Sequence, residues 1–338
     1  MSIRLFPLLM LLLIAVQSGA QQRSEVRDYG SAEVLYDRPG EIRKLFLGVQ
    51  PLYGEFFTAG VNAGFGIDAH YLPGRKFDAR LQFRRPWASR FFDQAREDAR
   101  RNSDTDNDPL RFHYIEAGFS YHIIDRDAPG KLRVIVYDRR LKGEKWAATV
   151  PATKDFKGQV RTILSARTGM LRWQSSLDVS GALARQGKTN STVGLPETIV
   201  DELGRTLPFR AYANMKSIAV FGGIGFTRIR NAAVGFQKFE STLDDGIMGF
   251  YADLMYAPSL SFESVSWSSD IYPIDGLKKA SFGYRVGLDS KFNRVIGLGL
   301  GAEAGKRPGP AKDNFYLVLK ASLPVLGSNL IFPRKSGK

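Results

Sequence analysis

Residues 57–71 have the sequence FTAGVNAGFGIDAHY, in which apolar side chains occupy every second position without a break. Thr, Gly, Asn, Asp and His fill the positions between them. Successive side chains of a β-strand point to opposite faces, so this alternation predicts one long strand with an apolar face and a polar face. Strands of soluble proteins are usually about five or six residues long, and this one is more than twice that length.

The same alternation returns along most of the chain, at 76–84, 115–123, 132–137, 171–180, 280–289, 295–305 and 314–323. The apolar faces are continuous, whereas the polar faces carry charged residues in mid-strand. A soluble all-β protein is the alternative, but it would need those charges at its surface. A closed barrel in lipid accommodates both faces and leaves no unpaired strand edge. The prediction is an all-β fold: a transmembrane antiparallel β-barrel of about twelve strands, within a range of 10–14.

The first twenty residues have the layout of a secretory signal peptide. Arg4 precedes an apolar run at 5–16, and small residues at 18–20 predict cleavage after Ala20. The run is too short for a membrane helix, which needs about 20 apolar residues. We expect a signal peptide at 1–20, a polar periplasmic leader at 21–42, the barrel at 43–325, and at 326–338 a tail or the end of the last strand. The 338 residues contain no cysteine, which excludes disulfides and thiolate chemistry.

Over nearly all of its mature length the chain resembles bacterial outer-membrane β-barrel proteins. The segments FGYRVG at 282–287 and EAGKRPG at 303–309 are similar to segments of barrels of the Bacteroidota type. The resemblance implies residence in the outer membrane of a Gram-negative cell envelope. The chain departs from it at its end, because many such barrels finish on an aromatic residue and this sequence finishes on Lys338.

Turn-forming residues predict breaks between strands at 53–54, 72–75, 128–130, 167–169 and 244–246. Three connections are long: 85–109, 184–208 and 259–277. If the chain starts in the periplasm, the long connections lie outside the cell, as in outer-membrane barrels. Apolar spacing predicts a helix that starts near Pro86, and similar spacing predicts a second helix within 195–207.

The polar faces predict the lining of the barrel lumen. The residues expected to line it are Asp78, Arg80, Arg84, Glu116, Arg172, Arg285, Asp289, Glu303 and Lys320. An ion pair of Arg285 with Glu303 would help to fill the interior. The alternative is a narrow polar path, which would favour anions because the formal net charge is +14.

A serine, an aspartate and two histidines form a weak catalytic candidate: Asp68, His70, Ser120 and His122. Strand direction places them toward one end of the barrel, and Ser, His and Asp together suggest acyl transfer. However, Ser120 and His122 lie two positions apart on one strand, roughly 6–7 Å, which is too far for a direct hydrogen bond. We therefore expect no enzyme activity. With three histidines and no cysteine, we also expect no metal site and no cofactor.

These observations predict an outer-membrane barrel that is a narrow anion-leaning channel or a structural membrane component. Two alternatives remain: a secretion or assembly accessory barrel with a closed lumen, and a barrel-embedded lipid hydrolase. The expected partners are outer-membrane lipid and lipopolysaccharide, together with small anionic solutes or an envelope protein. Nucleic acid is not expected as a partner of an exported protein.

Overall fold

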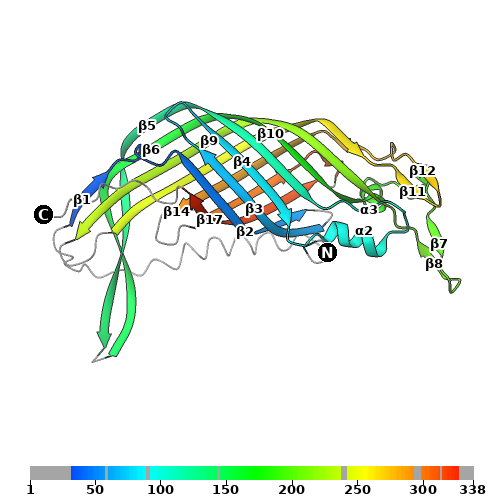
Figure 1. Ribbon diagram of the computed structural model, residues 1–338, viewed down its shortest axis with the longest axis horizontal. Helices are drawn as coiled ribbons and strands as arrows, with labels where there is room; N and C mark the ends of the chain where they lie inside the picture. Colours follow the sequence, from blue (N-terminus) through cyan, green and yellow to red (C-terminus); the bar gives the residue numbers. More distant parts are fainter. Residues whose placement is uncertain are drawn as a thin grey trace.

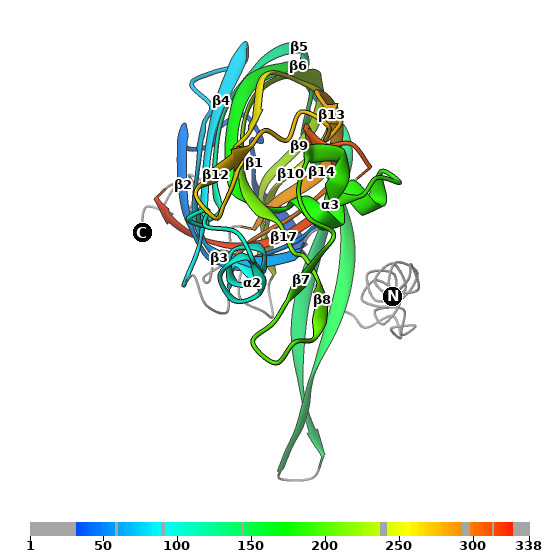
Figure 2. The same ribbon diagram turned by 90° about the vertical axis from the view of Figure 1, so that its right-hand side faces the viewer.

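The computed structural model describes residues 32–57, 60–88, 92–142, 145–236, 242–292, 298–312 and 314–326. The predicted signal peptide, residues 21–31 of the predicted leader and the predicted tail beyond 326 lie outside these residues. Ten antiparallel strands form a closed ring (Figures 1 and 2). In spatial order they are β9 (Tyr212–Phe236), β10 (Thr242–Phe262), β14 (Phe282–Phe292), β15 (Gly299–Lys306), β17 (Phe315–Leu326), β2 (Leu45–Phe57), β3 (Gly60–Tyr71), β4 (Phe77–Pro86), β5 (His113–Lys142) and β6 (Lys145–Asp178), and β6 pairs with β9 to close the ring.

The ring has two strands fewer than the twelve expected, at the lower end of the predicted range. Of the predicted turns, only 72–75 separates two strands. The turn-like residues at 53–54, 128–130, 167–169 and 244–246 lie inside β2, β5, β6 and β10. Pairing along a neighbouring strand overrides their local preference for a turn. Pro129 is tolerated because β4 pairs with β5 only as far as Tyr121, so that β5 has a free edge there.

The connections differ in size between the two ends of the barrel. One end, here called the loop end, carries the long connections and every described helix (Figure 1). Its elements are α2 (Gln94–Asn102), α3 (Val179–Arg185), the 3₁₀ helix η1 (Asn190–Val193) and the paired short strands β7 (Thr198–Val200) with β8 (Thr206–Pro208), β11 (Val265–Trp267) with β12 (Asp270–Tyr272), and β13 (Lys279–Ala280) with β16 (Gly309–Pro310). The opposite end, here called the turn end, holds the turn between β3 and β4. Short turns at one end and long loops at the other are typical of outer-membrane barrels.

Both predicted loop helices need correction. Pro86 ends β4, and α2 begins only at Gln94, because the Asp93 side chain caps it by accepting from the Arg96 amide. The second predicted helix is the β7–β8 hairpin. Its turn is set by Asp201, whose side chain accepts from two backbone amides, and by Gly204 at φ +73°.

The predicted polar leader contributes a strand. β1 (Ala32–Asp37) pairs with the last residues of β9, at 232–236. β6 has already left β9 at that level, since their pairing stops at Arg161 and Ile229. From there β5 and β6 continue together as a two-stranded ribbon, whose lower part projects from the turn end in Figure 1. β1 therefore covers the edge of β9 that β6 leaves open.

A bulge at Pro51 shifts the alternation of β2. Gln50 pairs with Gly66, but the next pair along β3 is Tyr53 with Gly64. Proline cannot donate to the ladder, and an extra residue in one strand moves the following side chains to the other face. Tyr53 and Glu55 consequently point into the barrel, where they are 0 % and 1 % exposed.

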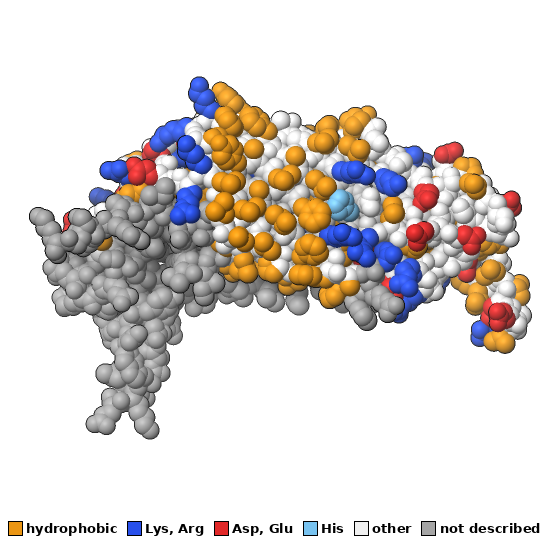
Figure 3. Space-filling model, viewed as in Figure 1, with side chains coloured by type: hydrophobic (Ala, Val, Ile, Leu, Met, Phe, Trp, Pro, Cys, Tyr) orange, Lys and Arg blue, Asp and Glu red, His pale blue; other side chains and the backbone are white. Residues whose placement is uncertain are grey.

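The outer surface of the ring is apolar at mid-height. Leu254, Ile224 and Val286 are 73 %, 62 % and 55 % exposed on three different strands. Figure 3 shows orange side chains gathered over the middle of the wall that faces the viewer, with Lys and Arg on either side. In the described part of the chain, no helix is both long enough and apolar enough to span a membrane.

Candidate functional site: the barrel lumen

Arg285 of β14 is the centre of the polar network inside the barrel. Its Nη1 and Nη2 donate to the two carboxylate oxygens of Glu116 at 2.6 and 2.7 Å, and its Nε donates to Asp253 at 2.9 Å. Asp253 also accepts from Arg167 Nε at 3.0 Å. Arg285 is 1 % exposed, so its charge is balanced entirely by protein groups. Two-pronged contacts of this kind join opposite walls of the lumen.

Glu303 occupies the neighbouring position. Its two oxygens accept from the hydroxyl groups of Tyr251 at 2.6 Å and Tyr316 at 2.7 Å. Arg285 Nη1 lies 3.6 Å from Glu303, so the predicted Arg285–Glu303 ion pair is present. Glu303 thus ties β15 to β10 and β17, and the tyrosine rings fill space between these strands.

Two further arginines share one carboxylate nearer the loop end. Arg84 Nη1 donates to Glu55 at 3.2 Å, and Arg307 Nη1 also donates to Glu55. The guanidinium carbon of Arg84 lies 3.9 Å from the ring centroid of Tyr114, and that of Arg307 lies 3.8 Å from the ring centroid of Tyr316. The negative ring faces offset the second positive charge that a single carboxylate cannot balance.

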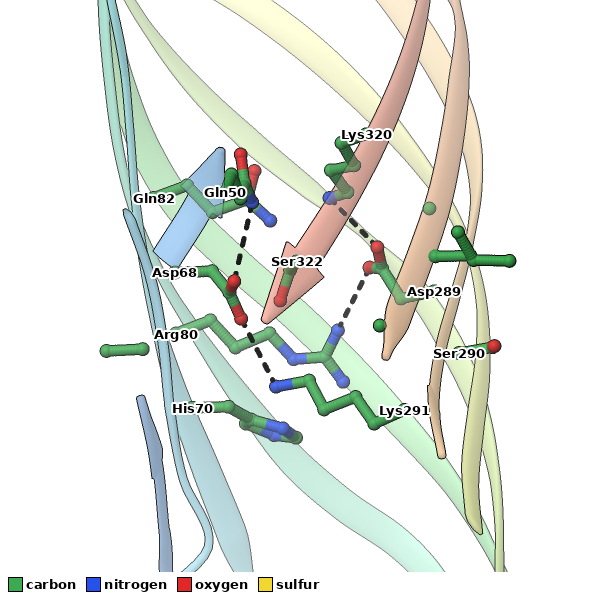
Figure 4. A pocket seen from close by; sticks show the side chains of 14 residues that line it. Gln50, Asp68, His70, Arg80, Gln82, Asp289, Ser290, Lys291, Lys320 and Ser322 are labelled. Carbon is green, nitrogen blue, oxygen red and sulfur yellow. Dashed lines mark hydrogen bonds and ion pairs between the residues drawn. The ribbon is translucent and has the colours of Figure 1, made fainter. Parts of the chain in front are cut away.

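A small cavity lies between this network and the turn end. Asp289 contacts Lys320 at 2.8 Å and Arg80 at 3.7 Å, and Lys291 lies 3.4 Å from Asp68 (Figure 4). The cavity volume is about 40 Å³. A water molecule needs roughly 10–15 Å³ of such space, so the cavity has room for about three.

Asp78 collects four side chains at the turn end of the network. His70 Nε2 lies 3.1 Å from Asp78 Oδ1, and His122 Nε2 lies 3.0 Å from Asp78 Oδ2. Ser120 Oγ and Arg80 Nε each lie 3.3 Å from Asp78 Oδ1. The predicted proximity of these residues is therefore observed, with Asp78 at the centre. Asp68 lies apart, beside Lys291 and Gln50.

The order of contacts in this cluster is not that of a catalytic triad. A nucleophilic serine is activated by a hydrogen bond to a histidine, which a carboxylate orients from its far side. Here Ser120 donates to the carboxylate itself. Ser120, His70 and His122 are 3 %, 4 % and 6 % exposed, which leaves little access for a substrate. Among the described residues, no group of three or more His, Asp or Glu side chains has the geometry to hold a metal ion.

The charges inside the barrel balance. Among the described residues, the interior ion pairs join eight cations to eight carboxylates, and their side chains are at most 25 % exposed. They are Arg80, Arg84, Arg161, Arg167, Arg285, Lys291, Arg307 and Lys320 with Glu55, Asp68, Asp78, Glu116, Asp125, Asp253, Asp289 and Glu303. The positive net charge of the chain therefore does not reside in the lumen.

Apolar clusters lie inside the barrel toward both of its ends. At the turn end, Ile42, Phe46 and Leu72 pack with Ile163, Ile229 and Ile247 from the barrel wall. At the loop end, a larger cluster joins barrel strands to α3 and the long loops, and it includes Leu171, Trp173, Leu183 and Phe209. Among the described residues, the interior therefore holds ion pairs at mid-height and apolar contacts toward each end.

A barrel with a charged interior and an apolar exterior inverts the arrangement of a soluble protein. The exposed band is stable where lipid covers it, and ring closure pairs the strand edges that lipid could not hydrate. This chain is a transmembrane β-barrel protein. The structure supports the predicted fold class, while assignment to a Bacteroidota-type family stays a prediction.

Comparison with known proteins adds little to this description. No protein-family model and no curated protein matches the chain. Among solved structures, it is 8 % identical to the CymD monoaromatic hydrocarbon channel, covering 87 % of this chain and 93 % of that one, with a TM-score of 0.22. It is 9 % identical to the outer-membrane expressed OmpT of Vibrio cholerae, covering 86 % of this chain and 100 % of that one, with a TM-score of 0.19. These values are too low to transfer a property from either protein to this barrel.

Eight of the nine residues predicted to line the lumen lie inside the barrel, and Arg172 does not. Arg172 is exposed on the outer surface, between Ile115 and Ile218 on the neighbouring strands. Its neighbours Leu171 and Trp173 point inward into the loop-end cluster. Beyond the lipid band, the outer face of the barrel meets polar surroundings and the inner face packs against an apolar core. In this part of the strand the polar side chains therefore point outward and the apolar side chains point inward.

Several members of the network were not predicted from the sequence. Glu55 follows the Pro51 bulge, Arg167 lies in a predicted turn, and Arg307 lies outside the alternating segments. Asp253 belongs to an alternating run in β10, where Tyr251, Asp253 and Met255 are buried and the residues between them are exposed. Of these four residues, only Asp253 lies in an alternating run from which its inward direction could have been predicted.

Proposed function

We propose that this protein is an outer-membrane barrel with a closed lumen that serves as a structural or assembly accessory component of the cell envelope. The supporting observation is the filled interior. Balanced ion pairs occupy the middle, apolar clusters pack toward both ends, and the cavity between them has room for only about three waters. A conducting path would require many buried charged groups to lose their partners at the same time.

The two ends of the barrel are the surfaces available to partners. At the turn end, the β5–β6 ribbon continues beyond the barrel wall, and among the described strands none pairs with its outer edges, where a partner chain can add a strand. At the loop end, Leu203 and Ile271 are 75 % and 73 % exposed on the β7–β8 and β11–β12 hairpins, outside the lipid band. Exposed apolar residues of this kind mark contact surfaces.

The closed lumen is tested by conductance in a planar bilayer. The refolded mature chain should insert and give no discrete current steps. The double variant Arg285→Ser/Glu116→Ser removes both members of one cross-lumen pair and serves as the opened comparison. Discrete, anion-selective current steps from the unaltered barrel would overturn the proposal and support the predicted anion channel instead. Heat-modifiable mobility on gels verifies that each sample is a folded, inserted barrel.

The accessory role is tested by photo-crosslinking in intact cells. A crosslinking residue at Lys157, exposed on the ribbon, should capture an envelope protein, whereas one at Leu254, on the lipid-facing wall, should not. Equal capture at both positions, or none at the ribbon and at Leu203, would contradict a partner-binding role.

A further inference from the structure

The outer wall carries a group of basic residues just beyond the apolar band, on the side of the loop end. Arg85 of β4, Arg172 of β6 and Lys216 of β9 are all exposed, and His113 of β5 lies between them. We call these four residues the basic patch. Figure 3 shows Lys and Arg side chains around one histidine at this border of the orange band.

Strand register places Arg85, His113 and Lys216 in one row, and Arg172 in the next row toward the middle of the barrel, where it pairs with Ile115 and Ile218. His113 pairs with Gln174, and Gln174 pairs with Lys216, so β5, β6 and β9 present these side chains at the same height. Arg84, the neighbour of Arg85, pairs with Tyr114, the neighbour of His113, which continues the row onto β4. Four adjacent strands are spaced about 4.8 Å apart, so the patch extends roughly 14 Å around the barrel.

The cations of the patch differ from those inside the barrel. Every interior cation named above has a carboxylate partner. In the described parts of the chain, no carboxylate lies within 4.0 Å of Arg85, Arg172 or Lys216. Like charges that lie together without a counter-charge repel one another, and an anion bound between them relieves that repulsion.

The surroundings indicate which anion fits. The row that contains Arg172 also contains Phe83, Ile115 and Ile218, so the patch borders directly on the apolar band. The Phe83 ring meets the His113 ring edge-on at 5.2 Å between centroids. Phe65 pairs with Arg85, and its ring is tilted against that of Trp87 with 5.0 Å between centroids. A ligand at this border has its anionic part among the cations and its apolar part along the band.

We infer that the basic patch binds the phosphate groups of an anionic glycolipid in the membrane leaflet that surrounds the loop end. The acyl chains lie along the apolar band, the aromatic side chains hold the boundary, and Arg85, Arg172 and Lys216 pair with phosphate oxygens. The inference rests on the outer-membrane location in the proposed function and on the outward direction of the loop end that the sequence predicts, and it is independent of whether the lumen conducts.

The test measures lipid binding to the purified full barrel in detergent by native mass spectrometry. The probes are bisphosphorylated lipid A, the same glycolipid without its phosphates, and inorganic phosphate. The triple variant Arg85→Gln/Arg172→Gln/Lys216→Gln should bind the bisphosphorylated lipid roughly a hundredfold more weakly, since each cation near an anionic surface contributes about fivefold in affinity.

A control variant removes the same charge elsewhere. Arg126→Gln/Lys157→Gln/Arg228→Gln alters three exposed basic residues of the turn end and should keep the affinity within about twofold of the unaltered barrel. The conservative variant Arg85→Lys/Arg172→Lys should recover most of the binding. All these positions are at the surface, so each variant should retain the heat-modifiable mobility of a folded barrel.

Three results would overturn the inference. Equal binding of the dephosphorylated glycolipid would show that the apolar band alone holds the lipid. An equal loss in the turn-end control would show that only net charge matters. Competition by inorganic phosphate at the concentration of the lipid would mark a site for a free anion. Conductance of the same samples reports on the lumen separately, so either proposal can fail while the other stands.

Discussion

Arg285 and Glu116 meet across the lumen in a two-pronged ion pair, with donor–acceptor distances of 2.6 and 2.7 Å. They are 169 residues apart in the sequence and belong to β14 and β5, which are not neighbours in the ring. The pair therefore connects opposite parts of the wall. Ion pairs of this kind, between strands that are not neighbours, occupy the middle of the barrel interior.

The first prediction concerns this pair. Arg285→Leu should lower the free energy of unfolding by about 3–5 kcal/mol, because it leaves Glu116 as a buried charge without its main partner. Adding Glu116→Leu should recover part of that loss, since Asp253 keeps Arg167 and Glu303 keeps its hydrogen bonds from Tyr251 and Tyr316. Unfolding in urea from lipid vesicles measures both effects. A double variant that loses the sum of the two single losses would contradict a coupled pair.

A second prediction separates a structural from a catalytic role for the Asp78 cluster. Asp78→Ala removes the acceptor shared by His70, His122 and Ser120 and should cost about 3 kcal/mol or more. Ser120→Ala removes one hydrogen bond and should cost only about 1 kcal/mol.

The same samples test the hydrolase alternative. Neither variant should change the release of fatty acid from phospholipid or glycolipid, because the unaltered barrel should release none. Hydrolysis by the unaltered barrel that Ser120→Ala abolishes would establish the enzyme instead.

The third prediction concerns a close approach between neighbouring strands. The Tyr251 ring lies over Gly287, its cross-strand partner, and a Cβ atom at Gly287 would lie 2.2 Å from the ring. Gly287→Ala should therefore displace Tyr251 from Glu303 and cost about 1–3 kcal/mol. Gly74→Ala is the matched control, since nothing lies within 4 Å of that position. Equal thermal stability of the two variants would refute the packing argument.

The fourth prediction is a pH dependence at the turn end. Hydrogen bonds from Arg38 and Tyr36 hold the pKa of Glu41 below its ordinary value of 4.5. The folded chain thus binds this proton less readily than the unfolded chain. The stabilisation is complete above the ordinary value and is lost as the pH falls through the lowered one.

Hydrogen exchange provides the readout for this dependence. The Arg38 amide donates to the Asn231 carbonyl at 3.1 Å, so its protection should fall in that acidic range. In Glu41→Gln the Arg38 amide should show the low protection of the acidic range at every pH, so that its protection no longer depends on pH. An unchanged step in Glu41→Gln would assign the dependence to another group.

The alternation of side chains determined the class of fold. At 57–71, as in the other alternating segments, the polarity of each residue depends only on whether its face of the strand meets lipid or the lumen. That property is local, because it depends on the geometry of a single strand. It predicted the closed barrel, the long loops at one end and most of the residues that point inward. It overestimated the number of strands, because turn-forming residues at 128–130 and 167–169 are held in strands by their neighbours.

The tertiary structure alone decided what the lumen contains and where the unpaired charges lie. Arg285 pairs with Glu116, and Arg307 pairs with Glu55. The partners lie far apart in the sequence, so no local pattern predicts that they meet. The bulge at Pro51 turns Glu55 inward, and the loop-end core turns Arg172 outward. Ring closure brings these choices together, because an interior charge is stable only when the opposite wall supplies its partner.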